Sequence, residues 1–302
     1  MAGGVSRPGG RRTRPGLSCQ AGRVAAHPIW ICPACGANFP PSAAPPERCP
    51  LCEDERQWVP PTGQRWTTMD QLAGDGHHSV IREVEPGLIG IAAEPDIGVG
   101  QRALLVRTDE GNLLWDPPPF VDEAAFDAVR AAGGLSAISS SHPHMYGAAV
   151  EWSNAFGVPI LLPEADTAWL MRPGAQVQRW SATLQPLPGI TLVQCGGHYA
   201  GSSVLHWVAG ADGRGAILCG DTIFVTPGED RVSFVYSAPV RLPLAAPGVQ
   251  GIVDALAPFA FDRIYGGWWS PVVRRDGKRI LERSAARYIE LLTTVAEPRP
   301  PV

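Results

Sequence analysis

The sequence contains no apolar run that approaches the ~20 residues needed to cross a bilayer, so it predicts no membrane span. An excess of one charge is also missing, because 25 basic and 29 acidic side chains leave a net charge of −4. This balance gives no reason to expect a nucleic acid or a membrane surface as a partner. No apolar segment lies between Arg12 and Cys19, where an export or lipoprotein signal would need one. We therefore expect a cytoplasmic protein.

The chain of 302 residues has room for one large domain and a small module, and its 45% of hydrophobic residues is ordinary for a packed protein. Residues 1–28 are basic, rich in glycine and proline, and show no apolar periodicity. Such a segment buries too little apolar surface to fold, so we expect a disordered tail there. We place the small module at 29–60 and the main domain at 67–302.

Two cysteine pairs with the spacing C-x-x-C lie in the small module, Cys32 with Cys35 and Cys49 with Cys52. Four thiolates can close a tetrahedral shell around Zn²⁺. Because no secretion signal is apparent, disulfide bonds are the less favoured interpretation. The segment resembles a zinc ribbon, or a rubredoxin-like iron site with a short intervening loop. We predict structural zinc, with iron or a redox role as the alternative.

A closed shell of four cysteines has no open position for a substrate. We therefore expect the module to fold around its metal and to dock, or to recruit a protein partner, without taking part in catalysis. Trp30, Phe39 and Trp58 are the candidates for its small apolar core.

The main domain has a strand-rich pattern interrupted by helices. Short apolar or alternating runs predict strands at 79–84, 88–92, 103–108, 113–116, 158–162, 183–187, 190–195, 203–208 and 216–219. Capped or amphipathic stretches predict helices at 122–132, 148–156, 164–171, 247–256 and 282–295. Periodicity alone indicates an α/β or α+β fold.

Three apolar runs of the main domain end in residues that commonly bind metals. His142 and His144 follow the run at 135–138, His198 follows a run and two glycines, and Asp221 follows the run at 217–219. Alternate residues of an extended segment point to the same side, so the first two imidazoles can face one ion. An H-x-H pair is weak evidence alone, and the other two strand ends strengthen it.

The order H-x-H, then G-G-H, then G-D-T resembles the metallo-β-lactamase superfamily, including its glyoxalase II-like members. The resemblance covers about residues 70–295 and implies a four-layer αβ/βα sandwich. In that family, the residues that correspond to His142, His144, His198 and Asp221 hold the first metal, and we expect the same role here. Three imidazoles and one carboxylate suit Zn²⁺, and also Fe²⁺ or Mn²⁺.

The second metal position of the family has no matching ligands in this sequence. The family's first motif reads H-x-H-x-D-H, but Tyr146 and Gly147 stand in the D-H positions. Its final histidine is also missing, because none of the seven histidines follows His206, and Trp268 stands in its place. We expect one metal position to be retained and the other to be lost. The side chains expected to line the lost position are those of Met145, Tyr146, Trp268 and Trp269.

The resemblance implies a metal-dependent hydrolase in which one Zn or Fe ion activates a water molecule. Asp221 and Tyr146 are the candidate catalytic residues, and Tyr146 can offer a hydrogen bond where the family has a carboxylate. The implied substrate is a small molecule with an ester, thioester, lactam or phosphodiester bond.

Two other functions remain open at this point. Some glyoxalase II-like members of the family bind one Fe²⁺ and oxidise persulfides with dioxygen, although they usually keep the D-H half of the motif. The fold can also bind a ligand or keep a structural ion without catalysis, while the cysteine module engages a partner.

Four further residues have expected roles outside the ligand set. We expect Asp116 to orient a neighbouring ligand or to cap a turn. His77 and His78 follow a Gly-Asp-Gly turn and are expected to be solvated, and His206 is expected to be a partly exposed strand residue.

Overall fold

The computed structural model describes residue 1, residues 27–174 and residues 176–294. The tail predicted at 1–28 falls almost wholly outside these residues, and Cys19 lies outside them too. The described chain begins with the small cysteine-containing module and continues into a large domain of two sheets and flanking helices.

A seven-stranded sheet forms the first half of the main domain, and its strands lie side by side in sequence order. They are β1 (His78–Glu85), β2 (Leu88–Glu94), β3 (Arg102–Thr108), β4 (Gly111–Trp115), β5 (Ala137–Ser139), β6 (Ile160–Pro163) and β7 (Val177–Trp180). The first four strands pair antiparallel, and β4 to β7 pair in parallel. Strand β7 lacks an apolar run, which is why periodicity missed it.

A six-stranded sheet forms the second half, in the order β17, β16, β11, β10, β9, β8. The bounds are β8 (Thr183–Leu187), β9 (Ile190–Gln194), β10 (Ser203–Trp207), β11 (Ala216–Leu218), β16 (Arg263–Tyr265) and β17 (Val272–Val273). Two small sheets pair β12 (Phe224–Val225) with β13 (Val232–Ser233) and β14 (Val235–Ser237) with β15 (Leu242–Pro243). These short strands have no readable period.

The helices connect or flank these sheets. They are α1 (Pro50–Glu53), α2 (Met69–Gly74), α3 (Glu123–Ala131), η1 (Pro143–Met145), α4 (Ala149–Phe156), η2 (Glu164–Trp169), α5 (Gly210–Gly213), α6 (Ala246–Leu256) and α7 (Gly277–Thr293). The Asp122 side chain caps α3 by accepting a hydrogen bond from the Ala125 amide, as the sequence predicts. Helix α7 begins five residues before the predicted 282, because its first turn buries Ile280 and Leu281.

Alternating side chains of β3 separate two of the apolar cores. Leu104 packs with Leu205 of β10 in the core between the sheets. Its neighbour Leu105 faces the other way and packs in the core that contains Val129 of α3 and Trp152 of α4. One sheet therefore buries both of its faces.

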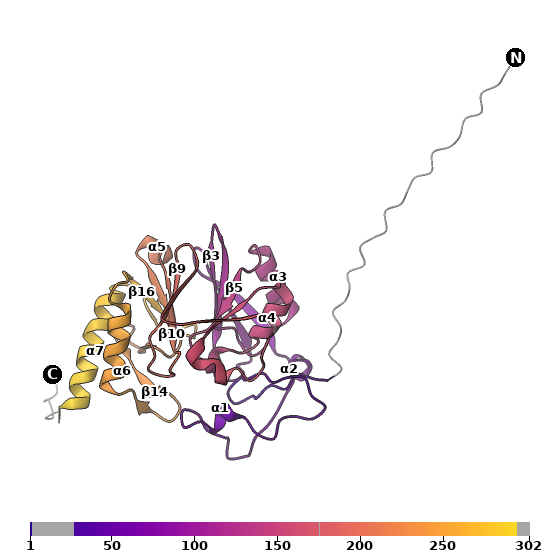
Figure 1. Cartoon of the computed structure of the whole chain (residues 1–302), viewed down its shortest axis with the longest axis horizontal. Helices are drawn as coiled ribbons and strands as arrows, with labels where there is room; N and C mark the ends of the chain where they lie inside the picture. The colour runs from indigo at the N-terminus through magenta and orange to yellow at the C-terminus, as the bar shows by residue number, and fades with distance from the viewer. Residues whose placement is uncertain (2–26, 175, 295–302) are drawn as a thin grey trace.

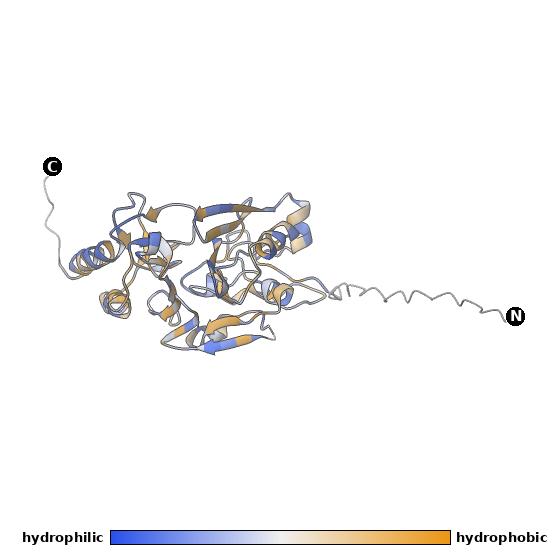
Figure 2. Ribbon diagram, turned by 90° about the horizontal axis from the view of Figure 1, so that it is seen from above, coloured by the Kyte–Doolittle hydropathy of each residue, from blue (hydrophilic) through white to orange (hydrophobic). Residues whose placement is uncertain are grey.

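The second sheet repeats this arrangement on the opposite side. Val204 of β10 lies in a core with Ile252 of α6 and Leu281 of α7, while Leu205 faces the first sheet. Figure 1 shows α3 and α4 on one side and α6 and α7 on the other, and Figure 2 shows that these helices carry both hydrophobic and hydrophilic residues. The predicted four-layer αβ/βα sandwich is confirmed.

The cysteine module packs on the main domain, with α1 close to β14 at one end of the sandwich (Figure 1). Its apolar core includes Phe39 and the partly buried Trp30, and Trp169 from the main domain joins it. The prediction that Trp58 belongs to this core is wrong, because half of its surface is exposed. Trp66 packs edge to face on Phe39 instead, at 4.9 Å between ring centroids.

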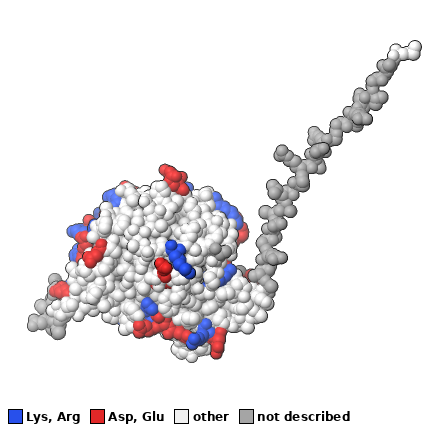
Figure 3. Space-filling view, viewed as in Figure 1, with Lys and Arg blue, Asp and Glu red and all other residues white. Residues whose placement is uncertain are grey.

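Basic and acidic side chains are interspersed over the face of the molecule in Figure 3, as the near balance of charge predicts. Within the described residues, no helix combines the length and the apolar character that a bilayer crossing requires.

Candidate metal centre

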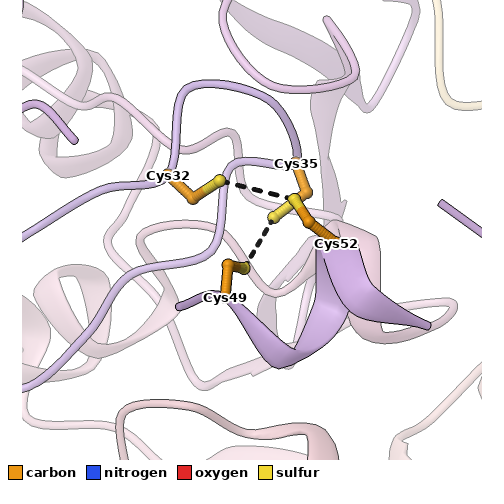
Figure 4. A group of neighbouring side chains, drawn as sticks. All are labelled: Cys32, Cys35, Cys49 and Cys52. Atoms are coloured by element: carbon orange, nitrogen blue, oxygen red, sulfur yellow. Dashed lines mark hydrogen bonds between the residues drawn. The ribbon is translucent and has the colours of Figure 1, made fainter. Parts of the chain in front are cut away.

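The four predicted cysteines of the small module converge on one point and are buried. Cys32 and Cys35 flank a tight loop, which Gly36 closes by donating from its amide to the Cys32 carbonyl at 2.8 Å. Gly36 has a φ of +81°, a conformation that side-chain-bearing residues rarely adopt. Cys49 lies at the start of α1 and Cys52 within it, and all four thiols point inward (Figure 4).

The spacing of these sulfur atoms fits a metal. The Cys32 and Cys52 Sγ atoms are 3.5 Å apart, and so are those of Cys35 and Cys49. The edge of a tetrahedron with ~2.3 Å bonds to zinc is ~3.8 Å, so little movement is needed to bind the ion. Hydrogen bonds among the four thiols lower the pKa of Cys32 and Cys49 and raise that of Cys35 and Cys52, so the thiols share their protons while no cation balances the charge. The group could therefore bind a metal.

A second cluster consists of His142, His144, His198 and Asp221, whose ligand atoms all lie within 4.8 Å of one another. Its residues come from both sheets. His142 and His144 follow β5 at the start of η1, His198 lies between β9 and β10, and Asp221 follows β11. The structure thus brings together all four residues that the sequence predicts.

Hydrogen bonds behind the cluster fix which nitrogen of two imidazoles faces it. His198 donates from Nδ1 to the Tyr236 carbonyl at 2.7 Å, so its Nε2 carries the lone pair. His142 Nδ1 lies 3.0 Å from Ser141 Oγ, and this hydroxyl donates to Asp116 Oδ2 at 3.1 Å. Burial raises the pKa of Asp116 to about 8, so a positive charge in the cluster, such as a bound cation, would be needed to keep this carboxyl ionised at pH 7. With Asp116 ionised, Ser141 accepts from His142, and Nε2 again faces the cluster. The contact fits the prediction that Asp116 orients a neighbouring ligand, and that role stays a prediction.

The third imidazole, that of His144, contacts Tyr199, an aromatic residue against which the cysteine module packs. His144 Nε2 lies 3.1 Å from the Tyr199 hydroxyl, which leaves Nδ1 for an ion. The Arg56 guanidinium of the module lies 3.8 Å from the centroid of the Tyr199 ring. Arg56 also donates to the His198 carbonyl at 3.1 Å and pairs with Asp54 at 2.6 Å. The small module therefore touches the surroundings of two predicted ligands.

Burial sets the protonation of the cluster. It lowers the pKa of His144 to about 3 and that of His198 to about 4, and it holds the pKa of His142 well below its usual value. All three imidazoles are therefore neutral at pH 7, the form that binds metals. Burial raises the pKa of Asp221 to about 7, because an isolated carboxylate is poorly solvated there.

Buried nitrogen and oxygen atoms without a hydrogen-bond partner indicate whether the cluster fits a cation. His142 Nε2, His198 Nε2 and Asp221 Oδ1 are buried and have no hydrogen-bond partner among the described residues. Asp221 Oδ2 lies 3.7 Å from His142 Nε2 and 3.8 Å from His198 Nε2. These distances are slightly longer than the ~3.3 Å edge of a tetrahedral shell with ~2.0 Å bonds. Because buried polar atoms are normally satisfied, the donor set fits one bound cation.

The residues predicted at the lost second position fall into different places. Met145 is buried, and its Cε lies 3.0 Å from where a Cβ on Gly267 would stand. Trp268 donates from its indole to the Val99 carbonyl at 2.9 Å and lines a cavity with Gly220, the residue before Asp221. Tyr146 is buried, and its hydroxyl has no hydrogen-bond partner in the part of the chain that the structure describes.

The other predicted residue, Trp269, faces a different part of the molecule. Its ring lies over Gly90 and within 4.6 and 5.1 Å of the guanidinium groups of Arg82 and Arg102.

Sequence reasoning missed Ser141, Tyr199 and Arg56 as supports of the cluster. Ser141 precedes His142 and Tyr199 follows His198, so adjacency to a predicted ligand is the signal that could have found these two residues, and Arg56 has no such signal. His206 was predicted to be partly exposed, but it is buried and its Nε2 bonds the Ala260 carbonyl at 2.8 Å. His77 does not join the cluster and lies against Phe120.

Comparisons with known proteins agree with this architecture. No family model matches the sequence. The chain is 39% identical over 269 residues to the uncharacterized protein YmaE of Bacillus subtilis (strain 168), which covers 88% of this chain and 98% of that protein.

Solved structures give the fold. The crystal structure of DIM-1 metallo-β-lactamase exposed to ceftazidime superposes with a TM-score of 0.54 at 14% identity, covering 72% of this chain and 98% of that one. The crystal structure of VMB-1 at pH 5.5 gives 0.53 at 12% identity, covering 72% and 99%. The chain therefore belongs to the same family as YmaE of Bacillus subtilis, and its main domain has the metallo-β-lactamase fold.

Proposed function

We propose that this chain is a metal-dependent hydrolase whose main site holds one metal ion on His142, His144, His198 and Asp221. The observation that carries the proposal is the set of buried, unpartnered atoms on His142, His198 and Asp221, which lie within reach of one cation. Zinc bound there would supply a water molecule with a pKa near 7. The same donors also suit iron and manganese.

The protein's own residues orient these donors and limit access to them. The chain Asp116–Ser141–His142 and the bond from His198 to the Tyr236 carbonyl fix two imidazoles in the orientation that an ion requires. Burial keeps the Tyr146 hydroxyl protonated by raising its pKa well above the usual range. Tyr146 can therefore donate a hydrogen bond, which is the catalytic role that we propose for it.

A cavity of about 160 Å³ borders Gly220, the residue before Asp221, and supports a small substrate, although none of the four cluster residues lines it. Its walls include Gly220, Phe224, Trp268 and Pro271, and they are mainly apolar. We propose that it accepts an apolar group next to an ester, thioester, lactam or phosphodiester bond, because such walls favour apolar surface. In this proposal the cysteine module holds a structural zinc ion.

A substrate panel tests the proposal. Purified protein loaded with zinc, and separately with iron or manganese, is assayed with ester, thioester, lactam and phosphodiester substrates. We expect turnover in at least one class and a loss of ~100-fold or more in His142→Ala. His206→Ala is the matched control, because His206 is also buried but lies outside the cluster.

Two results would overturn hydrolysis. One is the absence of turnover across the panel for every metal, which would favour a ligand-binding role. The other is consumption of dioxygen with a persulfide by the iron form alone, which would identify an oxygenase.

A further inference from the structure

A cleft of about 390 Å³ lies between β1, an edge strand of the first sheet, and the end of the second sheet formed by β17 and β16. Four arginines line it with two aromatic rings, and they are Arg82, Arg102, Arg263, Arg274, Tyr265 and Trp269. The arginine side chains come from segments far apart in the sequence. The cleft is distinct from the cavity that borders Gly220, since the two have no lining residue in common.

Arg102 is the unusual member of this group. Only 2% of its surface is exposed, and its Nε and Nη2 atoms have no hydrogen-bond partner among the described residues. Its guanidinium lies 5.1 Å from the Trp269 ring and 5.9 Å from the Tyr265 ring. These aromatic faces stabilise the charge in part. The N–H groups still need acceptors, because an unmatched buried donor is costly.

The other three arginines already have carboxylate partners. Arg82 pairs with Glu94 at 3.0 Å, Arg274 pairs with Glu229 at 3.1 Å, and Arg263 pairs with Glu85. These pairs leave Arg102 as the cation of the cleft that no described carboxylate balances. Burial lowers its pKa only to about 10, so the side chain stays charged at pH 7.

Glu83 also borders the cleft, and its position on β1 matters. Arg82 and Val84 alternate with it along the strand, and both lie against the Trp269 region, Arg82 by its guanidinium and Val84 beside Gly90. Glu83 is exposed, and it bonds neither of the two unpartnered Arg102 nitrogens.

We propose that this cleft binds a small anion through a carboxylate or phosphate group held by the Arg102 guanidinium. The planar fork of arginine matches two oxygen atoms of either group. Because Nε and Nη2 are both buried, the Arg102 side chain must shift toward the cleft before an anion can satisfy these two nitrogens. Trp269 and Tyr265 form walls, and Arg82 and Arg274, each paired with a carboxylate, lie at the exposed mouth, where their guanidinium groups can contact an entering anion.

Thermal unfolding in the presence of inorganic phosphate or succinate tests this site. We expect the Tm of the wild-type protein to rise by about 3 °C or more over a phosphate or succinate titration, relative to sodium chloride of equal ionic strength. The more effective anion identifies which of the two groups the cleft prefers. Arg102→Met should lose this rise, and Arg102→Lys should keep a small part of it.

Further variants keep the test decisive. Arg102→Met should unfold at an equal or higher Tm without anion, since it removes an unpaired buried charge. If it fails to fold, the exposed Arg274→Gln should weaken binding several-fold, while Arg214→Gln, an exposed arginine outside the cleft, should not.

The metal cluster must be excluded as the binding site. The protection should persist in His198→Ala, which separates this site from the proposed hydrolase centre. Three results would overturn the proposal: no protection of the wild type, equal protection of wild type and the arginine variants, or loss of protection in His198→Ala.

Discussion

Gly147 follows Tyr146 at the position where a family histidine would bind a second metal. Its φ is +37°, and a Cβ built there would lie 2.2 Å from the Pro117 carbonyl oxygen. Backbone, not a movable side chain, blocks the position, so no ligand can be placed there while the loop keeps its shape. This blockage supports a site with a single metal.

Replacement of Gly147 tests whether backbone atoms block a second metal ligand at this position. We expect Gly147→His to add no second metal and to destabilise the protein by about 2 kcal/mol or more, because the side chain meets backbone atoms. Gly157→Ala is the control, since Gly157 has a φ of +68° but open space around its Cβ, and should cost about 1 kcal/mol. Chemical denaturation and metal analysis measure both effects. A stable Gly147→His protein with an additional ion would contradict the single-metal account.

Ser141 connects Asp116 to His142, so its hydroxyl should matter for metal affinity. We expect Ser141→Ala to weaken binding at the main site by ~10- to 100-fold, because His142 loses the bond that fixes its orientation. Ser139→Ala removes another buried hydroxyl, which bonds the Leu161 carbonyl, and should leave the affinity unchanged. Competition with a chelator measures both variants, and equal affinities would refute the orienting role.

The convergence of His142, His144, His198 and Asp221 could be predicted from sequence because their motifs are short and local. H-x-H, G-G-H and G-D-T each occupy a few consecutive residues at the end of an apolar run. The pairing of Tyr199 with His144 or of Arg56 with the His198 carbonyl could not be predicted, because it depends on how distant segments pack.

Among the elements of the fold, the cysteine module contacts the surroundings of the main site through Arg56. This side chain stacks on Tyr199, which in turn contacts His144, and its guanidinium bonds the His198 carbonyl. Tyr236, whose carbonyl holds His198, also bonds Glu55 of the same segment through its hydroxyl. One surface of the module thus supports the backbone and rings behind two predicted ligands.

Removal of the Arg56 side chain should therefore weaken the main site without emptying the cysteine shell. We expect Arg56→Ala to lower metal affinity at the main site by ~10-fold. Arg48→Ala is the matched control on the same module, because Arg48 is 73% exposed and makes only a surface ion pair with Glu53. The measurement is metal content of each variant after dialysis against a weak chelator. Identical retention in the two variants would show that the contact has no such effect.

Most of the long strands and helices could be predicted from the sequence, whereas the strands of two or three residues could not. Strands β1 to β4 and β8 to β11 have apolar or alternating runs, while β12 to β15 and β17 have two or three residues and no period. These short strands form through pairing alone. Two of them, β14 and β15, lie where His198 meets Tyr236, so sequence could not show what holds that ligand.

At the scale of the whole molecule, two sheets and their outer helices bring four side chains together from distant parts of the chain. The resemblance of three motifs to one superfamily predicted this sandwich, whereas periodicity alone stopped at a mixed α and β fold. Neither could predict that the cysteine module docks at the end of the sandwich next to the ligands, because docking depends on surface shape. The module's possible protein partner stays a prediction.

Loss of the metal from the cysteine module should also lower the thermal stability of the main domain. We expect Cys35→Ser to release the module's metal and to lower the Tm by several degrees, because Trp169 of the main domain packs on the module's core. Cys195→Ser, at a cysteine outside both clusters, is the control. Unfolding curves and metal content are compared, and a Cys35→Ser protein with wild-type values of both would contradict a structural metal.

The most direct test of the account is the metal content of the wild-type protein beside His198→Ala and His206→Ala. We expect about two ions per chain in the wild type and in His206→Ala, and about one in His198→Ala, which keeps the ion of the cysteine module. An unchanged ion count in His198→Ala would show that His142, His144, His198 and Asp221 do not hold a common metal.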